Sequence, residues 1–274
     1  MKNVILVTID CLRPDHLGCY GYQRNTSPCI DQLAKESAVY DNAFSNGPFT
    51  AASFVSILAG AHPLTFDTMV PLPRQAKLLS ESLGEKGIKS AAFNSNPYLS
   101  RHFGYSRGWD LFEDYLSDIS PSRTSPGWLG QIIPPRFMSL AYYLKLARQG
   151  EFYTHANKVT DDAIFWMNNR EGFFVWLHYM DVHEPYIRRP RHNDVYSKTL
   201  DDTDIGVLHY KIHWKEVDKK GRRSLVNLYD DRIRYVDKQL GRLLGFLKKA
   251  GQLDDTAIII TSDHGQQLFE QGVF

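Results

Sequence analysis

Two acidic residues stand at the ends of runs of β-branched and aliphatic residues, and a histidine follows one of them. Asp10 ends the run 4–9, whereas Asp263 and His264 follow the run 256–261. Such runs are typical of strands buried on both faces of a parallel sheet. If these strands are neighbours, the three side chains converge at their carboxyl ends, where ligands collect. Two carboxylates this close repel each other, and a bound cation would offset the repulsion. Taken alone, either acid could instead be a loop residue or a helix cap.

A threonine at the start of a predicted helix is the second candidate for chemistry. Thr50 immediately precedes the apolar segment 51–58, which Gly60 closes. Threonine in this position is a common N-cap, whose hydroxyl accepts a backbone N–H bond. The same helix end also offers free N–H groups and partial positive charge to a tetrahedral anion. A hydroxyl there that also bound a divalent metal could attack phosphorus or sulfur, so both interpretations stay open.

The elements that must position these residues alternate between strand and helix. Strands are predicted at 4–9, 88–93, 173–177 and 256–261, and helices at 27–37, 51–58, 77–86 and 227–250. This alternation predicts an α/β sandwich around a mostly parallel central sheet. The chain stops ten residues after His264. Because a sheet with chemistry at the end of its last strand usually continues, we expect C-terminal elements to be missing.

Two segments interrupt the alternation without suggesting a second domain. Residues 117–135 are rich in Ser, Pro and Gly, and residues 188–223 are polar and charged. We interpret both as surface insertions of one catalytic core spanning 1–274, because function-bearing loops of this kind lie on the surface.

Composition excludes several classes of protein. The net charge of +1 gives no reason to expect a nucleic-acid partner. No segment approaches the length of a membrane span, and MKNVILVTID is too short for a secretory signal. The three cysteines, Cys11, Cys19 and Cys29, lack CxxC spacing. This pattern favours reduced thiols and a cytoplasmic location, with each cysteine simplest as a small buried residue.

Several blocks of sequence resemble the sulfatase-like enzymes of the alkaline phosphatase superfamily. The matching blocks, in the order in which that family has them, are NVILVTIDCLRPDHLGCYGY, TSPCIDQLAKESAVYDNAFS, the helix closing in ILAG, FGYSRGWDLFEDY, WLHYMDVHEPY and DDRIRYVDKQLGRLLGFLKKAGQLDDTAIIITSDHG. The resemblance covers nearly the whole chain. It implies an alkaline-phosphatase-like three-layer sandwich.

The resemblance also implies roles for individual residues. Asp10, Asp263 and His264 match metal ligands, and Thr50 falls where the family places its nucleophile. His183, in the H-x-P-Y block, matches a histidine that faces the anionic oxygens of the substrate, although a structural role fits it equally well. Of the flanking polar residues, Arg13 and Asp15 are expected to pair with each other. Asn94 and Asn96 are expected mainly to form a turn.

Departures from the family pattern shape the expected activity. Sulfatases carry Cys or Ser at the position of Thr50, and that residue is converted to formylglycine. The extra methyl group of threonine prevents the conversion. Threonine is the nucleophile of phosphodiesterase and phosphoglycerol transferase relatives. Many sulfatases also have a second acid after Asp10, and Cys11 removes that hard oxygen ligand. The spacing of Asp181 and His183 does not fit a second metal, so we expect one ion.

Three hypotheses about function follow. The favoured one is a metal-dependent hydrolase or transferase of small anionic phosphoric esters, with Thr50 as the nucleophile. Its donors, three oxygens and one imidazole, suit manganese, magnesium or calcium, with zinc also acceptable. The second is a sulfuric ester hydrolase. The third is a non-catalytic metal-binding or regulatory domain, which the chain end and the missing second acid support.

Overall fold

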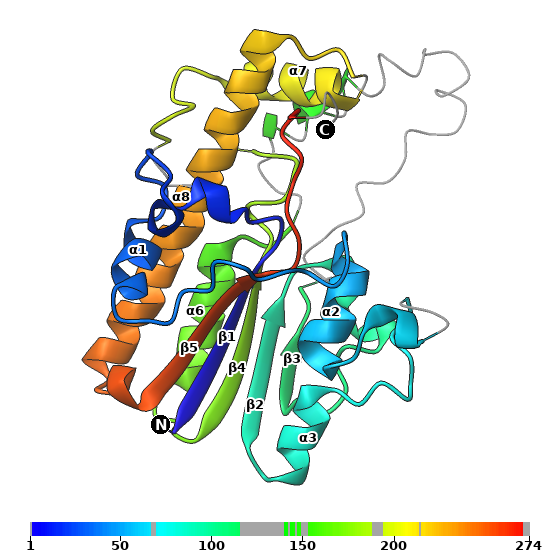
Figure 1. Cartoon of the computed structure of the whole chain (residues 1–274), viewed down its shortest axis with the longest axis vertical. Coiled ribbons are helices and arrows are strands. Elements are labelled where there is room, and N and C mark those ends of the chain that lie inside the picture. The colour runs from blue at the N-terminus through cyan, green and yellow to red at the C-terminus, as the bar shows by residue number, and fades with distance from the viewer. Residues whose placement is uncertain are drawn as a thin grey trace.

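The centre of the molecule is a parallel five-stranded sheet. The computed structural model describes residues 2–66, 70–115, 140–141, 143–145, 147–148, 153–187, 194–213 and 215–270. The strand order is β3-β2-β4-β1-β5, and every neighbouring pair is parallel (Figure 1). The strands are β1 (Asn3–Ile9), β2 (Lys89–Asn94), β3 (Leu111–Glu113), β4 (Phe173–Tyr179) and β5 (Thr256–Ser262). The predicted α/β class with a mostly parallel sheet is confirmed.

The two central strands are apolar on both faces because helices cover both. On β1, Ile5 and Val7 enter one core and Leu6 enters the other. All seven residues of β4 are buried. Burial of such side chains contributes on the order of 25 cal/mol per Å² of apolar surface. The outer strand β5 is less covered, and its Ile259 is 49% exposed.

Helices form a layer on each face of the sheet. One face carries α1, α6 and α8, and the other carries α2 and α3 (Figure 1). The helices with described bounds are α1 (Pro28–Ala34), α2 (Thr50–Ala59), α3 (Leu79–Glu85), α6 (Ala156–Met167), α7 (Asp202–His213) and α8 (Lys219–Lys249). The sheet and the two helical layers make the expected three-layer sandwich.

The longest helix, α8, packs its apolar stripe against α6 and α1. Its stripe recurs at helical spacing and is fully buried at Leu225, Leu228, Leu243 and Leu247. The Asp218 carboxylate accepts a hydrogen bond from the Gly221 backbone N–H at 2.7 Å, which satisfies one of the free donors of the first turn. The helix therefore begins before residue 227, where we predicted its start. The basic run in its first turns conceals the helical periodicity there.

The two expected insertions have different outcomes. Residues 117–135 lie outside the described part of the chain. The described part of 188–223 contains α7 and the first turn of α8, and it buries Ile205 and Leu208. This segment therefore contributes to the core on the α8 side of the sheet. The short strand β3 and the helix α6 were not predicted from the sequence.

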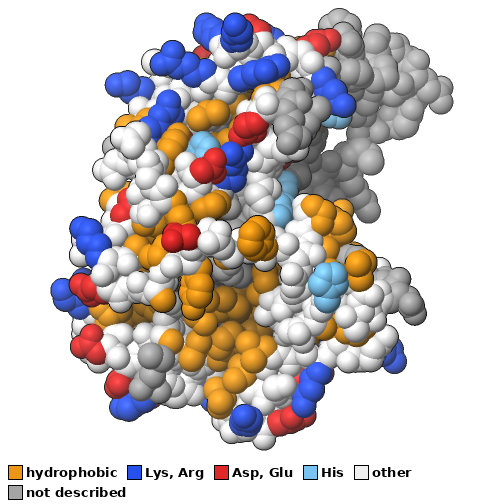
Figure 2. All heavy atoms as spheres, in the orientation of Figure 1, with side chains coloured by type: hydrophobic (Ala, Val, Ile, Leu, Met, Phe, Trp, Pro, Cys, Tyr) orange, Lys and Arg blue, Asp and Glu red, His pale blue; other side chains and the backbone are white. Residues whose placement is uncertain are grey.

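Hydrophobic side chains are exposed on the face of the molecule that Figure 2 shows. In Figure 2, hydrophobic side chains gather in front of the sheet, between the α1–α8 side and the α2–α3 side. Among the exposed hydrophobic residues is Ile259 of β5, which is paired in register with Leu6 of β1. Among the described helices, none has the length and apolar character needed to cross a membrane.

Candidate active site

The acids at the ends of β1 and β5 lie side by side. The register of the two strands pairs Ile9 with Ser262, so the next residues, Asp10 and Asp263, emerge together at the carboxyl edge. Both side chains are buried, with 0% and 1% exposure. Asp263 Oδ1 accepts hydrogen bonds from the Cys11 N–H at 3.2 Å and from the His264 N–H at 2.8 Å. The strand ends therefore position the carboxylate of Asp263 through the backbone.

The hydroxyl of Thr50 reaches the same place from α2. Phe49, in an extended conformation, is the N-cap residue, and Thr50 is the first helical residue. The Thr50 hydroxyl donates to Asp10 Oδ2 at 3.4 Å and lies 3.3 Å from His264 Nε2. The N-cap interpretation of Thr50 is therefore wrong. The prediction that its side chain meets the two strand ends is confirmed.

Two buried carboxylate oxygens at this site accept no hydrogen bond from the described residues. They are Asp10 Oδ1 and Asp263 Oδ2. Both face His264 Nε2, at 3.8 and 3.5 Å. His264 Nδ1 lies 2.9 Å from the Gly265 carbonyl oxygen. A proton on Nδ1 satisfies that carbonyl and leaves the Nε2 lone pair directed at the unpartnered oxygens.

A divalent cation fits this donor set. A buried polar atom without a partner costs free energy, and a buried carboxylate without a partner costs more. Two such oxygens and the Thr50 hydroxyl oxygen lie 3.3–3.8 Å from His264 Nε2. Together they form a set of oxygen and nitrogen donors typical of protein metal sites.

The pKa values of the two carboxyl groups are shifted in opposite directions. Burial, reinforced by the charge of Asp10, raises the pKa of Asp263 above its usual range. Burial also acts to raise the pKa of Asp10, but the hydrogen bond and charge of His178 outweigh it and hold that pKa well below its usual range. The raised pKa of Asp263 reflects the cost of two buried negative charges side by side, and a bound cation would offset that cost.

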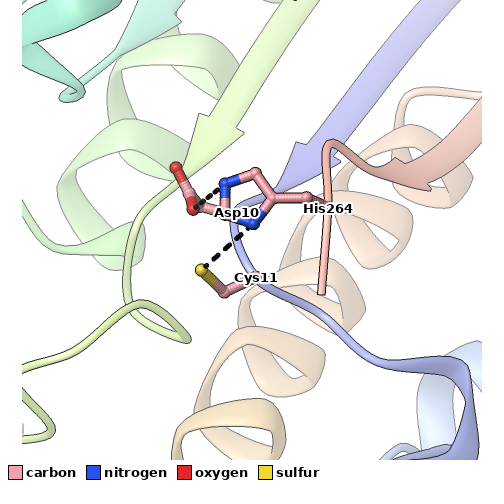
Figure 3. A group of neighbouring side chains, drawn as sticks. All are labelled: Asp10, Cys11 and His264. Atoms are coloured by element: carbon pink, nitrogen blue, oxygen red, sulfur yellow. Dashed lines mark hydrogen bonds and ion pairs between the residues drawn. The ribbon is translucent and has the colours of Figure 1, made fainter. Parts of the chain in front are cut away.

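A thiol joins this cluster. Cys11 is buried, and its Sγ lies 3.8 Å from His264 Nδ1. Figure 3 shows Asp10, Cys11 and His264 pointing toward one another at the ends of β1 and β5. One potential ligand atom from each of the three lies within 4.8 Å of the others. Burial and the neighbouring Asp10 carboxylate raise the pKa of the Cys11 thiol. Cys11 also has a φ of 60°, a conformation that few side chains other than Asn and Asp adopt readily.

A buried histidine that we did not predict orients Asp10. His178, on β4, is fully buried, with Nε2 3.3 Å from Asp10 Oδ2 and Nδ1 2.8 Å from Thr8 Oγ1. If Thr8 donates to Nδ1, His178 carries its proton on Nε2 and donates it to Asp10. The only local signal is a histidine inside the otherwise apolar run FFVWLHY.

Two further polar residues connect the loops around the site. Asn96 makes the expected turn, since its Oδ1 accepts from the Tyr98 N–H, but its Nδ2 also donates to Asp10 Oδ2 at 3.0 Å. The Ser45 hydroxyl lies 2.5 Å from the Asp263 carbonyl oxygen and 2.9 Å from Ser53 Oγ. Ser45 thereby connects the end of β5 to α2, and nothing in its local sequence indicated this.

The remaining candidates lie around the cluster. His183 is near enough for its charge to lower the pKa of Asp10. Among the described residues, no hydrogen bond joins it to Thr50 or His264, and its Nδ1 lies at the Glu184 carbonyl oxygen. Arg13 pairs with Asp15, as predicted, and its guanidinium also binds Glu270.

An open cavity of about 680 Å³ adjoins the cluster. Its lining residues come from the loop before α2 and from the segment after β5: Arg13, Ser45, Asn46, Gly47, Pro48, His264, Gly265, Gln266 and Gln267. His264 is therefore shared between the buried donors and the cavity. Pro48, two residues before Thr50, also lines the cavity, so the cavity borders the loop that leads into α2.

The fold and the clustered site define a class of protein. The structure aligns with the phosphonate monoester hydrolase of Agrobacterium radiobacter at a TM-score of 0.69 and 17% identity, covering 98% of this chain and 64% of that one. A protein of the alkaline phosphatase superfamily from Vibrio parahaemolyticus aligns at 0.63 and 14% identity, covering 98% and 56%. These similarities show an alkaline-phosphatase-like fold.

Sequence comparison is more specific. The family model described as Sulfatase matches residues 2–274, so the chain belongs to the sulfatase family. Human iduronate 2-sulfatase is 26% identical over 320 aligned residues, which cover 98% of this chain and 56% of that protein. The chain thus spans little more than half the length of the curated relatives it matches.

Proposed function

We propose that this chain is the catalytic core of a metal-dependent hydrolase or transferase of small anionic esters, with Thr50 as the nucleophile and phosphoesters as the favoured substrates. The observation that carries the proposal is the position of Thr50 Oγ1, 3.3 Å from His264 Nε2 and 3.4 Å from Asp10 Oδ2 at the first residue of α2. The name of the matching family and the names of the relatives support an ester-cleaving activity.

The proposed ligands of one divalent ion are Asp10, Asp263, His264 and the Thr50 hydroxyl. A bound ion supplies Lewis-acid chemistry: it lowers the pKa of the hydroxyl and offsets anionic charge on the substrate. The fit rests on the two unpartnered oxygens, Asp10 Oδ1 and Asp263 Oδ2. His178 and Asn96 hold the other oxygen of Asp10, so Oδ1 stays directed toward the site.

The reaction proposed for the chain's own residues is a displacement in two steps. Thr50 Oγ1 loses its proton to solvent and forms a bond to phosphorus as the bond to the ester oxygen breaks, and the leaving alcohol takes up a proton from solvent. Water or an acceptor alcohol then loses a proton and attacks phosphorus, the bond between phosphorus and Thr50 Oγ1 breaks, and Thr50 takes up a proton again. The N–H groups of Ala52 and Ser53 donate to the Phe49 carbonyl, and no backbone hydrogen bond to a described residue uses those of Thr50 and Ala51. These first two N–H groups of α2 are therefore proposed to bind the substrate's equatorial oxygens. His183 is proposed to face the same anionic group from the loop after β4.

Sulfate esters are the second candidate substrates. Phosphate and sulfate esters present the same tetrahedral arrangement of oxygens, and several matched relatives are named sulfatases. The proposal favours phosphoesters because Thr50 stands where formylglycine formation in a sulfatase needs Cys or Ser. Turnover of an aryl phosphate, an aryl phosphodiester and an aryl sulfate by the same preparation ranks the three. A clear preference for the sulfate would reverse the favoured order.

The nucleophile is tested by two matched variants. Thr50→Ala should lower kcat by at least about a thousandfold, as removal of a covalent nucleophile does in other enzymes. Thr50→Ser keeps the hydroxyl and should retain much of the activity. Circular dichroism and thermal unfolding check that both variants fold. Normal turnover by Thr50→Ala would refute the assignment, and a wild-type chain that neither binds a divalent ion nor cleaves any of the three esters would favour a non-catalytic role.

A further inference from the structure

The guanidinium of Arg13 connects the loop after β1 to the segment that follows His264. On the loop side, its Nε and Nη2 donate to the two carboxylate oxygens of Asp15, at 3.0 and 2.6 Å. On the other side, Nη1 donates to the Gln266 carbonyl oxygen at 2.9 Å and also to the Glu270 carboxylate. Four of the five N–H donors of the guanidinium are thus in use, and only 19% of the side chain is exposed.

The backbone of Arg13 is itself fixed to the core of the molecule. Its N–H donates to the Tyr229 hydroxyl at 2.9 Å, and that hydroxyl donates to the Cys11 carbonyl oxygen at 2.7 Å. Tyr229 is fully buried on α8, and α8 packs against α6 and α1. Arg13 is therefore a fixed point against which a neighbouring segment can be held.

The segment that Arg13 holds begins directly after His264. Gly265 passes beside the Arg13 side chain, since a Cβ at Gly265 would lie 3.5 Å from Arg13 Cγ. Farther along, the Glu270 carboxylate also accepts from the Leu268 N–H at 2.8 Å, and Leu268 is buried in the core on the α8 side. The Gly265 carbonyl oxygen, 2.9 Å from His264 Nδ1, thus belongs to a turn that Arg13 binds at the next residue.

We propose that Arg13 is a positioning residue, which orients the imidazole of His264 through the segment 265–270. By holding that segment, Arg13 keeps the Gly265 carbonyl oxygen at Nδ1 of His264, so the opposite ring nitrogen, Nε2, stays directed at the two buried carboxylates. The inference rests on the proposed function, in which His264 is a metal ligand. Lysine cannot take this role fully, because an ammonium group has three donors and no planar fork that fits a carboxylate at two points.

A role in stability alone predicts a different outcome. Breaking ion pairs that only stabilise the fold would lower the free energy of unfolding, but it would leave His264 in place in every molecule that stays folded. Cys11 reports the difference, because its Sγ lies 3.8 Å from His264 Nδ1 and its side chain is 1% exposed. An imidazole that moves away from this position opens the thiol to a reagent without unfolding the chain.

The test measures the rate at which a thiol reagent modifies Cys11 in the metal-free full chain. Cys19→Ser and Cys29→Ser form the background, so that Cys11 is the only thiol. Arg13→Met keeps a long apolar side chain without donors, and it should raise the rate by at least about tenfold because several hydrogen bonds between charged groups are lost. Arg13→Lys should give an intermediate rate. Metal affinity, measured by competition with a chelator, should fall by about 10- to 100-fold in Arg13→Met.

A matched pair of variants separates the segment from the loop. Glu270→Gln and Asp15→Asn each remove one exposed carboxylate charge beside Arg13, but only Glu270 lies on the segment after His264. Glu270→Gln should raise the labelling rate of Cys11, and Asp15→Asn should change it much less. An unchanged labelling rate in Arg13→Met and Glu270→Gln, in chains that circular dichroism shows to be folded, would overturn the proposal. Faster labelling in a chain whose wild type binds no metal would support the role of Arg13 and refute the proposed ion site.

Discussion

Replacing His178 should weaken the metal site through Asp10, although His178 itself is not a proposed ligand. Its Nε2 lies 3.3 Å from Asp10 Oδ2, and the ring is fully buried against Phe54 at a centroid distance of 5.0 Å. His178→Phe keeps the aromatic contact and removes the hydrogen bond. His178→Gln can place an amide N–H near the position of Nε2, so it is the matched control.

His178→Phe also loses the bond between Nδ1 and Thr8 Oγ1, but the expected effect on metal binding follows from the bond to Asp10. A buried hydrogen bond to a charged group contributes about 1.5–3 kcal/mol, and its loss leaves the Asp10 oxygen less stabilised. Because residues that orient a metal ligand typically change affinity by about 10- to 100-fold, His178→Phe should weaken metal binding by that factor. That factor equals about 1.4–2.8 kcal/mol, close to the range expected for the bond itself.

Two measurements check this prediction. Denaturant unfolding of the metal-free chain gives the free energy of unfolding, and competition against a chromophoric chelator gives the metal affinity. His178→Gln should recover at least part of both losses. A folded His178→Phe variant that binds metal as tightly as the wild type would refute the argument that His178 orients Asp10.

Three further predictions concern other parts of the structure. Removing the metal with a chelator should lower the melting temperature and restoring it should reverse the loss, since a ligand of the folded state alone stabilises by mass action; scanning calorimetry checks this. Gly47→Ala should lower kcat and stability, because a Cβ there would lie 2.3 Å from the Ala52 Cβ of α2; activity and thermal unfolding check this. Burial lowers the pKa of His209 to about 4 from 6.5. The stability due to neutral His209 is therefore complete above pH 6.5 and lost as the pH falls toward 4, by up to about 3 kcal/mol. His209→Gln should flatten this part of the unfolding free-energy profile.

Much of the fold could be predicted because its signals are local. The runs at 4–9 and 256–261 have the composition of doubly buried strands, and both are strands of the sheet. The short strand β3 escaped prediction because three residues carry no measurable periodicity. The start of α8 was not predicted because its first turns are rich in exposed lysine and arginine, a composition that is also typical of a loop.

The candidate site was only partly predictable, for a related reason. Asp10, Asp263 and His264 follow predicted strands, so the rule for parallel sheets already places them at one edge. His178 carries no such marker, since its partner Asp10 lies 168 residues away in the chain. Asn96 looked like a turn residue and is one, but its second hydrogen bond spans 86 residues.

The sequence by itself determined the family, the parallel α/β class and the residues that gather at the carboxyl edge of the sheet, because strand composition and motif order are properties of neighbouring residues. Only the tertiary structure decided that Thr50 turns its hydroxyl toward the site instead of capping α2, and that one oxygen of each acid accepts no hydrogen bond from the described residues. Those facts depend on side chains brought together from β1, β4, β5, α2 and the loop after β2. Contacts of that range are set by packing of the whole sheet, which no local pattern encodes.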